Sequence, residues 1–76
     1  MKELIAYMAR NLVAESGRVD VREVQGDQAD VYELAVAPSD KGQVIGKQGR
    51  TIRALRALVN AAAVRQGKRA VLDVVD

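Results

Sequence analysis

The sequence predicts an α+β domain with the element order α-β-β-α-α-β, in which a three-stranded mixed sheet carries its helices packed on one face. Three features predict this class. Apolar residues recur at helical spacing near the N-terminus and again after residue 49, apolar and polar residues alternate between residues 18 and 37, and the C-terminal segment is rich in valine. Because 76 residues leave room for one domain, we expect a single domain over residues 1–76.

The first half of the chain is expected to form one helix followed by a hairpin. Residues 2–15 carry apolar side chains at helical spacing, namely Leu4, Ile5, Met8 and Leu12. Gly17 is suited to the left-handed residue past a helix end. Two alternating segments, near 18–25 and 31–37, flank a short polar turn and therefore predict an antiparallel pair of strands.

The second half is expected to hold two helices and a last strand. Ser39 or Asp40 is placed to cap a helix of one or two turns. A longer helix should begin after Gly49 and run to about residue 66, where Gly67 follows. The segment 69–76 has the valine content of a strand.

The composition excludes most catalytic and metal-binding chemistry. The chain has no Cys and no His, so disulfides, thiolate metal sites and the usual general base are absent. The only serines are Ser16 and Ser39, and no nucleophile–base set can be assembled from them. We expect no enzyme activity, no cofactor and no metal. Neither an export signal nor a membrane-spanning stretch appears, which favours a cytoplasmic protein without membrane contact.

The charges are distributed unevenly along the chain. The net charge is only +2, but residues 41–69 hold eight cations and no Asp or Glu, whereas residues 1–40 hold four basic and eight acidic residues. A basic block of this kind is typical of a partner that is a polyanion.

The predicted long helix orients part of this block. One side of the helix is apolar, through Ile52, Leu55, Val59 and Ala62, and we expect it to face the sheet. The other side carries Arg50, Arg53, Arg56 and Asn60. Cations in the first turn of a helix oppose its dipole, at a cost of about 0.3 kcal/mol or more each, and a bound phosphate would reverse that penalty.

The segment Val44–Ile52, with the sequence Val-Ile-Gly-Lys-Gln-Gly-Arg-Thr-Ile, resembles the hydrophobic-Ile-Gly-x-x-Gly signature of KH domains. The element order resembles the type II arrangement, and the whole chain looks like the small bacterial single-KH proteins of the KhpA family. This resemblance implies a KH domain that binds single-stranded RNA. It also implies a homodimer, or a heterodimer with another KH-containing RNA-binding protein.

The expected RNA contacts centre on the loop from Gly46 to Gly49. Glycines let the backbone turn tightly and let a nucleic-acid strand approach, so that main-chain N–H groups donate to phosphate oxygens. By resemblance, bases would lie in a groove walled by the two helices and the strand 31–37. The residues expected to bind RNA are Ile45, Gly46, Lys47, Gln48, Gly49, Arg50, Arg53 and Arg56.

Alternatives to RNA binding stay open. The two glycines could serve only a tight turn between helices. A KH-like module for protein interaction or ribosome association, which does not bind free RNA, is the second function considered. Single-stranded DNA is a third ligand, because nothing in the sequence identifies a reader of the 2′-hydroxyl.

Overall fold

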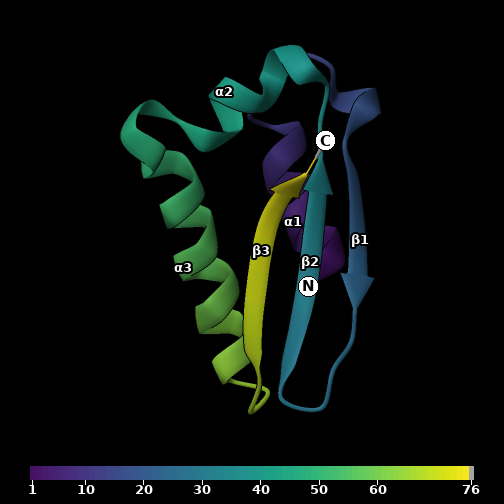
Figure 1. Ribbon diagram of the computed structural model, residues 1–76, viewed down its shortest axis with the longest axis vertical. Helices are drawn as coiled ribbons and strands as arrows, with labels where there is room; N and C mark the ends of the chain where they lie inside the picture. The colour runs from purple at the N-terminus through teal and green to yellow at the C-terminus, as the bar shows by residue number, and fades with distance from the viewer. Residues whose placement is uncertain (76) are drawn as a thin grey trace.

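A computed structural model describes residues 1–75, and its elements follow the predicted order (Figure 1). The helices and strands are α1 Lys2–Arg10, β1 Asp20–Val24, β2 Ala29–Ala35, α2 Lys41–Ile45, α3 Arg50–Val64 and β3 Arg69–Val75. The expected last strand is thus confirmed to Val75, and residue 76 lies outside the described residues.

The three strands form one mixed sheet in the order β1-β2-β3. β1 and β2 are an antiparallel hairpin in which Val21 lies opposite Leu34, as predicted. β2 and β3 are parallel, with Tyr32 opposite Leu72. Parallel neighbours need a crossover connection, and α2 and α3 provide it. β2 is therefore the central strand, and the expected α+β class is confirmed.

The helices cover one face of the sheet. In Figure 1 α1 lies behind the strands and α3 runs beside β3, whereas the near face of the sheet is bare. Three strand side chains that point to the helices are at most 3 % exposed, namely Tyr32, Leu34 and Leu72. They pack with Ile5 of α1 and Val59 of α3 in one core. Burial of these aliphatic side chains holds the sheet and helices together.

α1 is shorter than the predicted helix and ends at Arg10. The Nδ2 of Asn11 donates to the carbonyl oxygen of Tyr7 at 2.8 Å, and so occupies a carbonyl at the end of the helix. The N–H groups of residues 14–15 donate to the carboxylate of Asp40 rather than to helix carbonyls. A contact with a residue distant in sequence therefore keeps residues 14–15 out of the helix.

The two expected glycine stops have different outcomes. Gly67 has a φ of +73°, and the N–H of Lys68 donates to Ala63 O at 3.1 Å, which closes α3 near its predicted end. Gly17 is not left-handed and lies in the 3-10 turn Ser16–Arg18. Ala63 rather than Ala62 completes the buried side of α3.

Candidate nucleic-acid interface

A sharp corner joins α2 to α3. Gly46 ends α2 with φ 78° and ψ 168°, and a 3-10 turn over Lys47–Gly49 follows. Gln48 and Gly49 both adopt left-handed backbone angles, with φ of 58° and 75°. Left-handed conformations of this kind are rare outside glycine, and a non-glycine residue in one marks a constrained segment. The sequence prediction of a glycine-dependent corner between two helices is met.

Hydrogen bonds within the corner do not involve its first two main-chain N–H groups. The N–H of Gly49 donates to Gly46 O at 3.0 Å, and the N–H of Arg50 donates to Lys47 O. The first N–H groups of a helical turn have no partner within that turn, and here they belong to Lys47 and Gln48. They are donors of the kind that phosphate oxygens accept.

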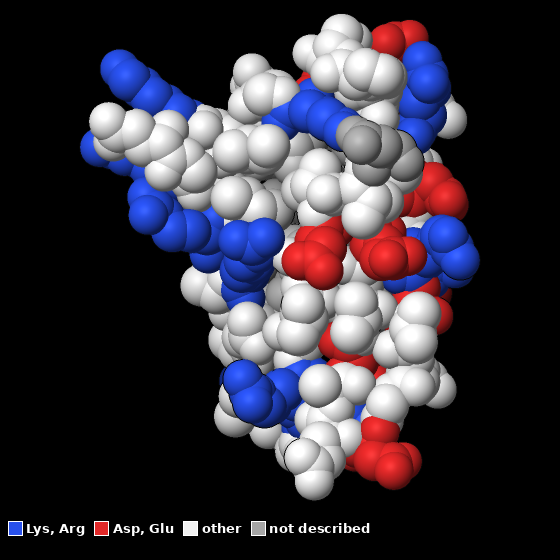
Figure 2. Space-filling model, viewed as in Figure 1, with Lys and Arg blue, Asp and Glu red and all other residues white. Residues whose placement is uncertain are grey.

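Exposed cations surround these donors. The side chains of Lys47, Arg50 and Arg53 belong to exposed residues at the corner and in the first turns of α3. Arg53 Nη2 donates to the carbonyl oxygen of Gln48 at 3.1 Å. This arginine therefore stabilises the corner and also contributes positive charge to it. In Figure 2 blue side chains follow the α3 edge of the molecule, whereas red ones with blue ones beside them lie over the strands of the bare sheet face. A polyanion is attracted to the α3 edge more than to the mixed charges of the sheet face.

Arg56 and Asn60 are exposed, as the helical wheel predicted, but both side chains also bond to the sheet. The Nε of Arg56 donates to Leu72 O at 2.9 Å, and Asn60 Oδ1 accepts from the N–H of Ala70 at 3.3 Å. Both partners are main-chain groups of β3, an outer strand. The two side chains thus occupy main-chain groups that an outer strand otherwise presents unpaired. Arg56 has a structural bond that Arg50 does not share.

The strand beside the helix pair is also different from the one expected. α3 packs along β3, and β2, which contains most of the segment 31–37, is the central strand. The side of any groove next to α3 is therefore formed by β3. Ile45, the last residue of α2, is 41 % exposed next to the corner, whereas Ile52 is buried. Ile45 is accessible to a ligand and Ile52 belongs to the core.

The outer side of α3 has an apolar surface that the sequence analysis missed. Leu58 is 56 % exposed and Val64 is 69 % exposed. Exposed alanines lie on the same side of the helix, at Ala54, Ala57 and Ala61. We call these five residues the outer face of α3. Their helical spacing is visible in the sequence, where Leu58 lies at the margin of the apolar side of the helix.

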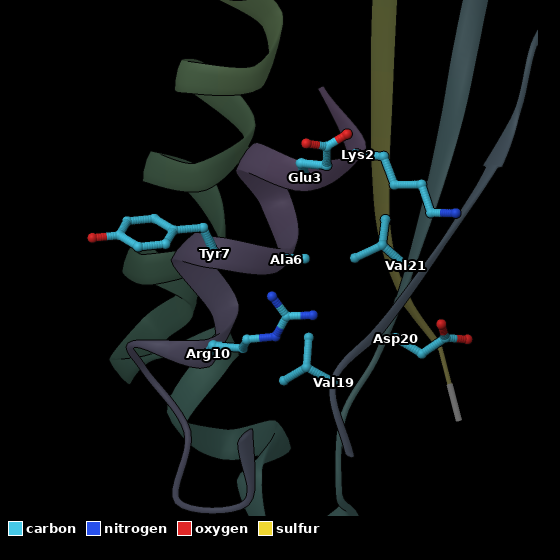
Figure 3. A pocket seen from close by; sticks show the side chains of 8 residues that line it. All are labelled: Lys2, Glu3, Ala6, Tyr7, Arg10, Val19, Asp20 and Val21. Atoms are coloured by element: carbon cyan, nitrogen blue, oxygen red, sulfur yellow. The ribbon is translucent and has the colours of Figure 1, made fainter. Parts of the chain in front are cut away.

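A pocket of about 420 Å³ lies elsewhere, between α1 and β1 (Figure 3). Its lining includes two cations and two carboxylates, from Lys2, Arg10, Glu3 and Asp20. The charges cancel, so the pocket offers a polyanion no advantage over the corner. Within residues 1–75, no group of three or more acidic side chains could hold a metal ion, and no helix is long and apolar enough to cross a membrane.

A glycine-flanked corner between two helices, within an α-β-β-α-α-β frame that contains a parallel strand pair, defines a KH domain. A family model described as the KH domain of KhpA/KhpB matches residues 2–74. The chain belongs to this family, and its predicted membership of the KhpA family is confirmed. KH domains are binding modules, so the prediction that the chain is not an enzyme is also confirmed.

Bacterial relatives match nearly the full length of the chain. The RNA-binding protein KhpA of Clostridium acetobutylicum is 47% identical over 75 residues, which cover 99% of this chain and 100% of the relative. That of Chlamydia pneumoniae is 45% identical over 76 residues, covering 100% and 97%. That of Aquifex aeolicus is 41% identical over 76 residues, covering 100% and 96%. No solved structure matches the chain.

Proposed function

We propose that this protein binds single-stranded RNA by holding its sugar–phosphate backbone at the corner from Gly46 to Gly49. The observation that carries the proposal is the combination of two amides without partners in their turn, at Lys47 and Gln48, with exposed cations beside them. Amides and cations together form a phosphate site that does not depend on base sequence. The name of the relatives, RNA-binding protein KhpA, agrees with this ligand.

Bases next to a phosphate held at the corner would lie on the surface beside the end of α2. The exposed side chain of Ile45 offers them an apolar contact. KH domains accommodate about four nucleotides, so we expect loose sequence preference. Most of the affinity should come from a few phosphate contacts and should fall as salt concentration rises. A post-transcriptional regulator or RNA chaperone acting in the cytoplasm fits such binding.

The double substitution Lys47→Asp and Gln48→Asp tests this function. It reverses the charge at the corner, and Asp tolerates the left-handed backbone of residue 48. Binding of a fluorescent single-stranded RNA should be lost at low salt, while the melting temperature stays nearly unchanged. A matched control is Lys2→Asp with Gln28→Asp, which makes the same charge change at exposed positions of the N-terminal half. The control should keep most of its affinity.

Three outcomes would contradict the proposal. If the wild-type protein bound no single-stranded oligonucleotide at low salt, a protein-interaction or ribosome-associated module would replace it. If the corner variant lost its fold together with its binding, the corner would be structural. If single-stranded DNA bound as tightly as RNA in parallel titrations, the ligand class would widen to both polymers.

We also propose that two copies associate through the outer face of α3. Leu58 and Val64 are exposed apolar side chains on the C-terminal part of α3, and the alanines beside them would let a second helix approach closely. Arg50 lies one turn before Ala54 on the same side of α3, so RNA at the corner and a second copy would be neighbours on this helix. A KH-containing partner of a different sequence is the alternative occupant.

A further inference from the structure

The carboxylate of Asp40 ties two distant parts of the chain together. Asp40 is 6 % exposed. Its Oδ1 accepts the N–H of Ala14 and its Oδ2 accepts the N–H of Glu15, both at 3.1 Å. These donors lie 26 and 25 residues away in sequence, in the connection between α1 and β1. Charge-assisted bonds of this kind are among the stronger hydrogen bonds in proteins, so the tie is firm.

Asp40 stands immediately before the helix that leads to the corner. α2 spans only Lys41–Ile45, and Gly46 follows it. An isolated helix of five residues has no stability of its own, so contacts with the rest of the protein must hold α2 in place. Val44 is fully buried and provides one such contact. The Asp40 carboxylate provides another, at the opposite end of the helix.

The carboxylate of Asp40 makes no hydrogen bond to its own helix. Asp40 occupies the N-cap position of α2, where an aspartate ordinarily accepts an N–H of the first turn. No such side-chain bond is present: Asp40 ends the 3-10 turn Pro38–Asp40 with helical backbone angles, φ −97° and ψ −7°. Its carboxylate instead accepts the N–H groups of residues 14–15. Such a choice is understandable where the position of the helix matters more than its intrinsic stability.

We infer that Asp40 is a positioning residue for RNA binding: it fixes the start of α2 against the α1–β1 connection and thereby holds the corner in its binding arrangement. This inference rests on the proposed function. Without the tie, α2 and the corner would sample other positions, and the ligand would bind only the fraction of molecules that is correctly arranged. The apparent dissociation constant rises by the inverse of that fraction.

Asp40→Asn is the test. The amide keeps one acceptor oxygen but places an NH2 group against a main-chain N–H, so one of the two bonds is lost. We expect affinity for single-stranded RNA to fall about tenfold, as for a corner that is correctly placed in about a tenth of the molecules. The salt dependence of binding should keep its slope, because Lys47, Arg50 and Arg53 still make their phosphate contacts. Amide hydrogen exchange should rise at Gly46–Gly49 and in residues 14–15, and not in the sheet.

Asp30→Asn is a matched control. Asp30 is the other buried carboxylate in the described chain, 8 % exposed, and its Oδ1 also accepts a main-chain N–H, that of Gly26 at 3.3 Å. It forms an ion pair with Lys68 as well. Asp30 lies at the start of β2, whereas Asp40 follows the end of that strand, so the same substitution acts at the other end of the sheet. It should lower stability without lowering the affinity of the folded protein.

Two results would overturn the inference. One is an Asp40→Asn protein that is folded and binds RNA as tightly as the wild type. The other is that Asp40→Asn and Asp30→Asn lose the same affinity, each in proportion to its loss of stability. Asp40 would then have only a structural role. Failure of the proposed function would give a different result. Wild-type protein would then bind no RNA, and the Lys47→Asp, Gln48→Asp variant would not differ from it in affinity.

Discussion

The α-carbon of Gly46 lies against Thr51, five residues further along the chain at the start of α3. A Cβ on residue 46 would overlap the Thr51 side chain, at 2.7 Å from its Cβ, and would lie 2.8 Å from its main-chain nitrogen. A Cβ on Gly49 would meet only the Ile52 side chain, at an ordinary 3.9 Å. The two glycines of the motif are therefore required for different reasons. Gly46 is required for space and for its backbone angles, whereas Gly49 is required for its backbone angles alone.

Gly46→Ala should therefore destabilise the protein more than Gly49→Ala. At residue 46 the left-handed backbone angles and the clash with Thr51 combine, so we expect a loss of about 3 kcal/mol in the free energy of unfolding. At residue 49 the backbone alone opposes alanine, and the loss should be about 1 kcal/mol. Urea denaturation of both variants measures the difference.

Removing the Thr51 hydroxyl gives a control for this prediction. Gly46→Ala combined with Thr51→Ala should recover little stability, because the main-chain nitrogen of residue 51 remains in the way. Equal losses for the two single variants, or full recovery in the double variant, would show that the close approach at Gly46 does not determine the corner.

Local patterns were sufficient to predict most of the fold. Strand alternation and helical spacing depend on near neighbours, and the element order, the hairpin and the position of the corner were all confirmed. The end of α1 could not be predicted in this way, because the carboxylate that takes the N–H groups of residues 14–15 belongs to Asp40. A contact between residues 25 or 26 positions apart leaves no recognisable pattern in the sequence around the helix end.

The candidate site was predicted less completely, for a related reason. The helical wheel placed Arg56 and Asn60 with the solvent-facing arginines, but their partners lie on β3. Knowing this requires the order of the strands, and the resemblance to KH domains had implied a groove walled by the helices and the strand 31–37. The corner residues needed no such knowledge, since glycine spacing and charge are read directly from the sequence.

Arg50→Ala and Arg56→Ala should separate binding from stability. Arg56 donates to Leu72 O, so its removal leaves a main-chain carbonyl without that donor and should lower the free energy of unfolding by about 1 to 2 kcal/mol. Arg50 opposes the helix dipole, so its removal should leave stability unchanged or slightly raised. RNA titrations over a range of salt should show a slope reduced by about 1 for Arg50→Ala and a smaller change for Arg56→Ala.

Arg56→Lys completes this comparison. Lysine keeps the charge but cannot place a donor where the Nε of arginine lies, so stability should not return. The reverse pattern, with Arg56 governing the salt slope and Arg50 the stability, would contradict the assignment of Arg56 to the β3 edge.

Tyr32 should make the protein sensitive to alkaline pH. Burial, followed by the hydrogen bond from its hydroxyl to Glu23 at 3.1 Å, raises the pKa of Tyr32 from 10.0 to about 12. The folded state keeps this proton where the unfolded chain has lost it. The contribution of Tyr32 to stability is thus complete below about pH 10 and is lost as the pH rises through about 12.

Urea denaturation at a series of alkaline pH values measures this loss. Wild-type protein should lose on the order of 2 kcal/mol over that interval through Tyr32. Tyr32→Phe lacks the titrating group and should show a smaller decline, whereas Tyr7→Phe, at an exposed ring, should decline as the wild type does. A Tyr32→Phe protein with the full decline would assign the alkaline sensitivity to other groups.

Leu58→Glu should separate the two copies that we propose to meet at the outer face of α3. A charge buried between two helices without a partner is costly, so the variant should sediment as a monomer at concentrations where the wild type is a dimer. The side chain is 56 % exposed in the single chain, so the fold should tolerate the change.

Val24→Glu is the matched control for self-association, because Val24 is equally exposed, at 56 %, but lies on β1. It should leave the sedimentation of the protein unchanged. The melting temperature of the wild type should rise with protein concentration, as mass action requires of a dimer, and that of Leu58→Glu should not. Monomeric wild-type protein at high concentration would remove the second copy from the outer face of α3 and leave a partner of different sequence as its occupant.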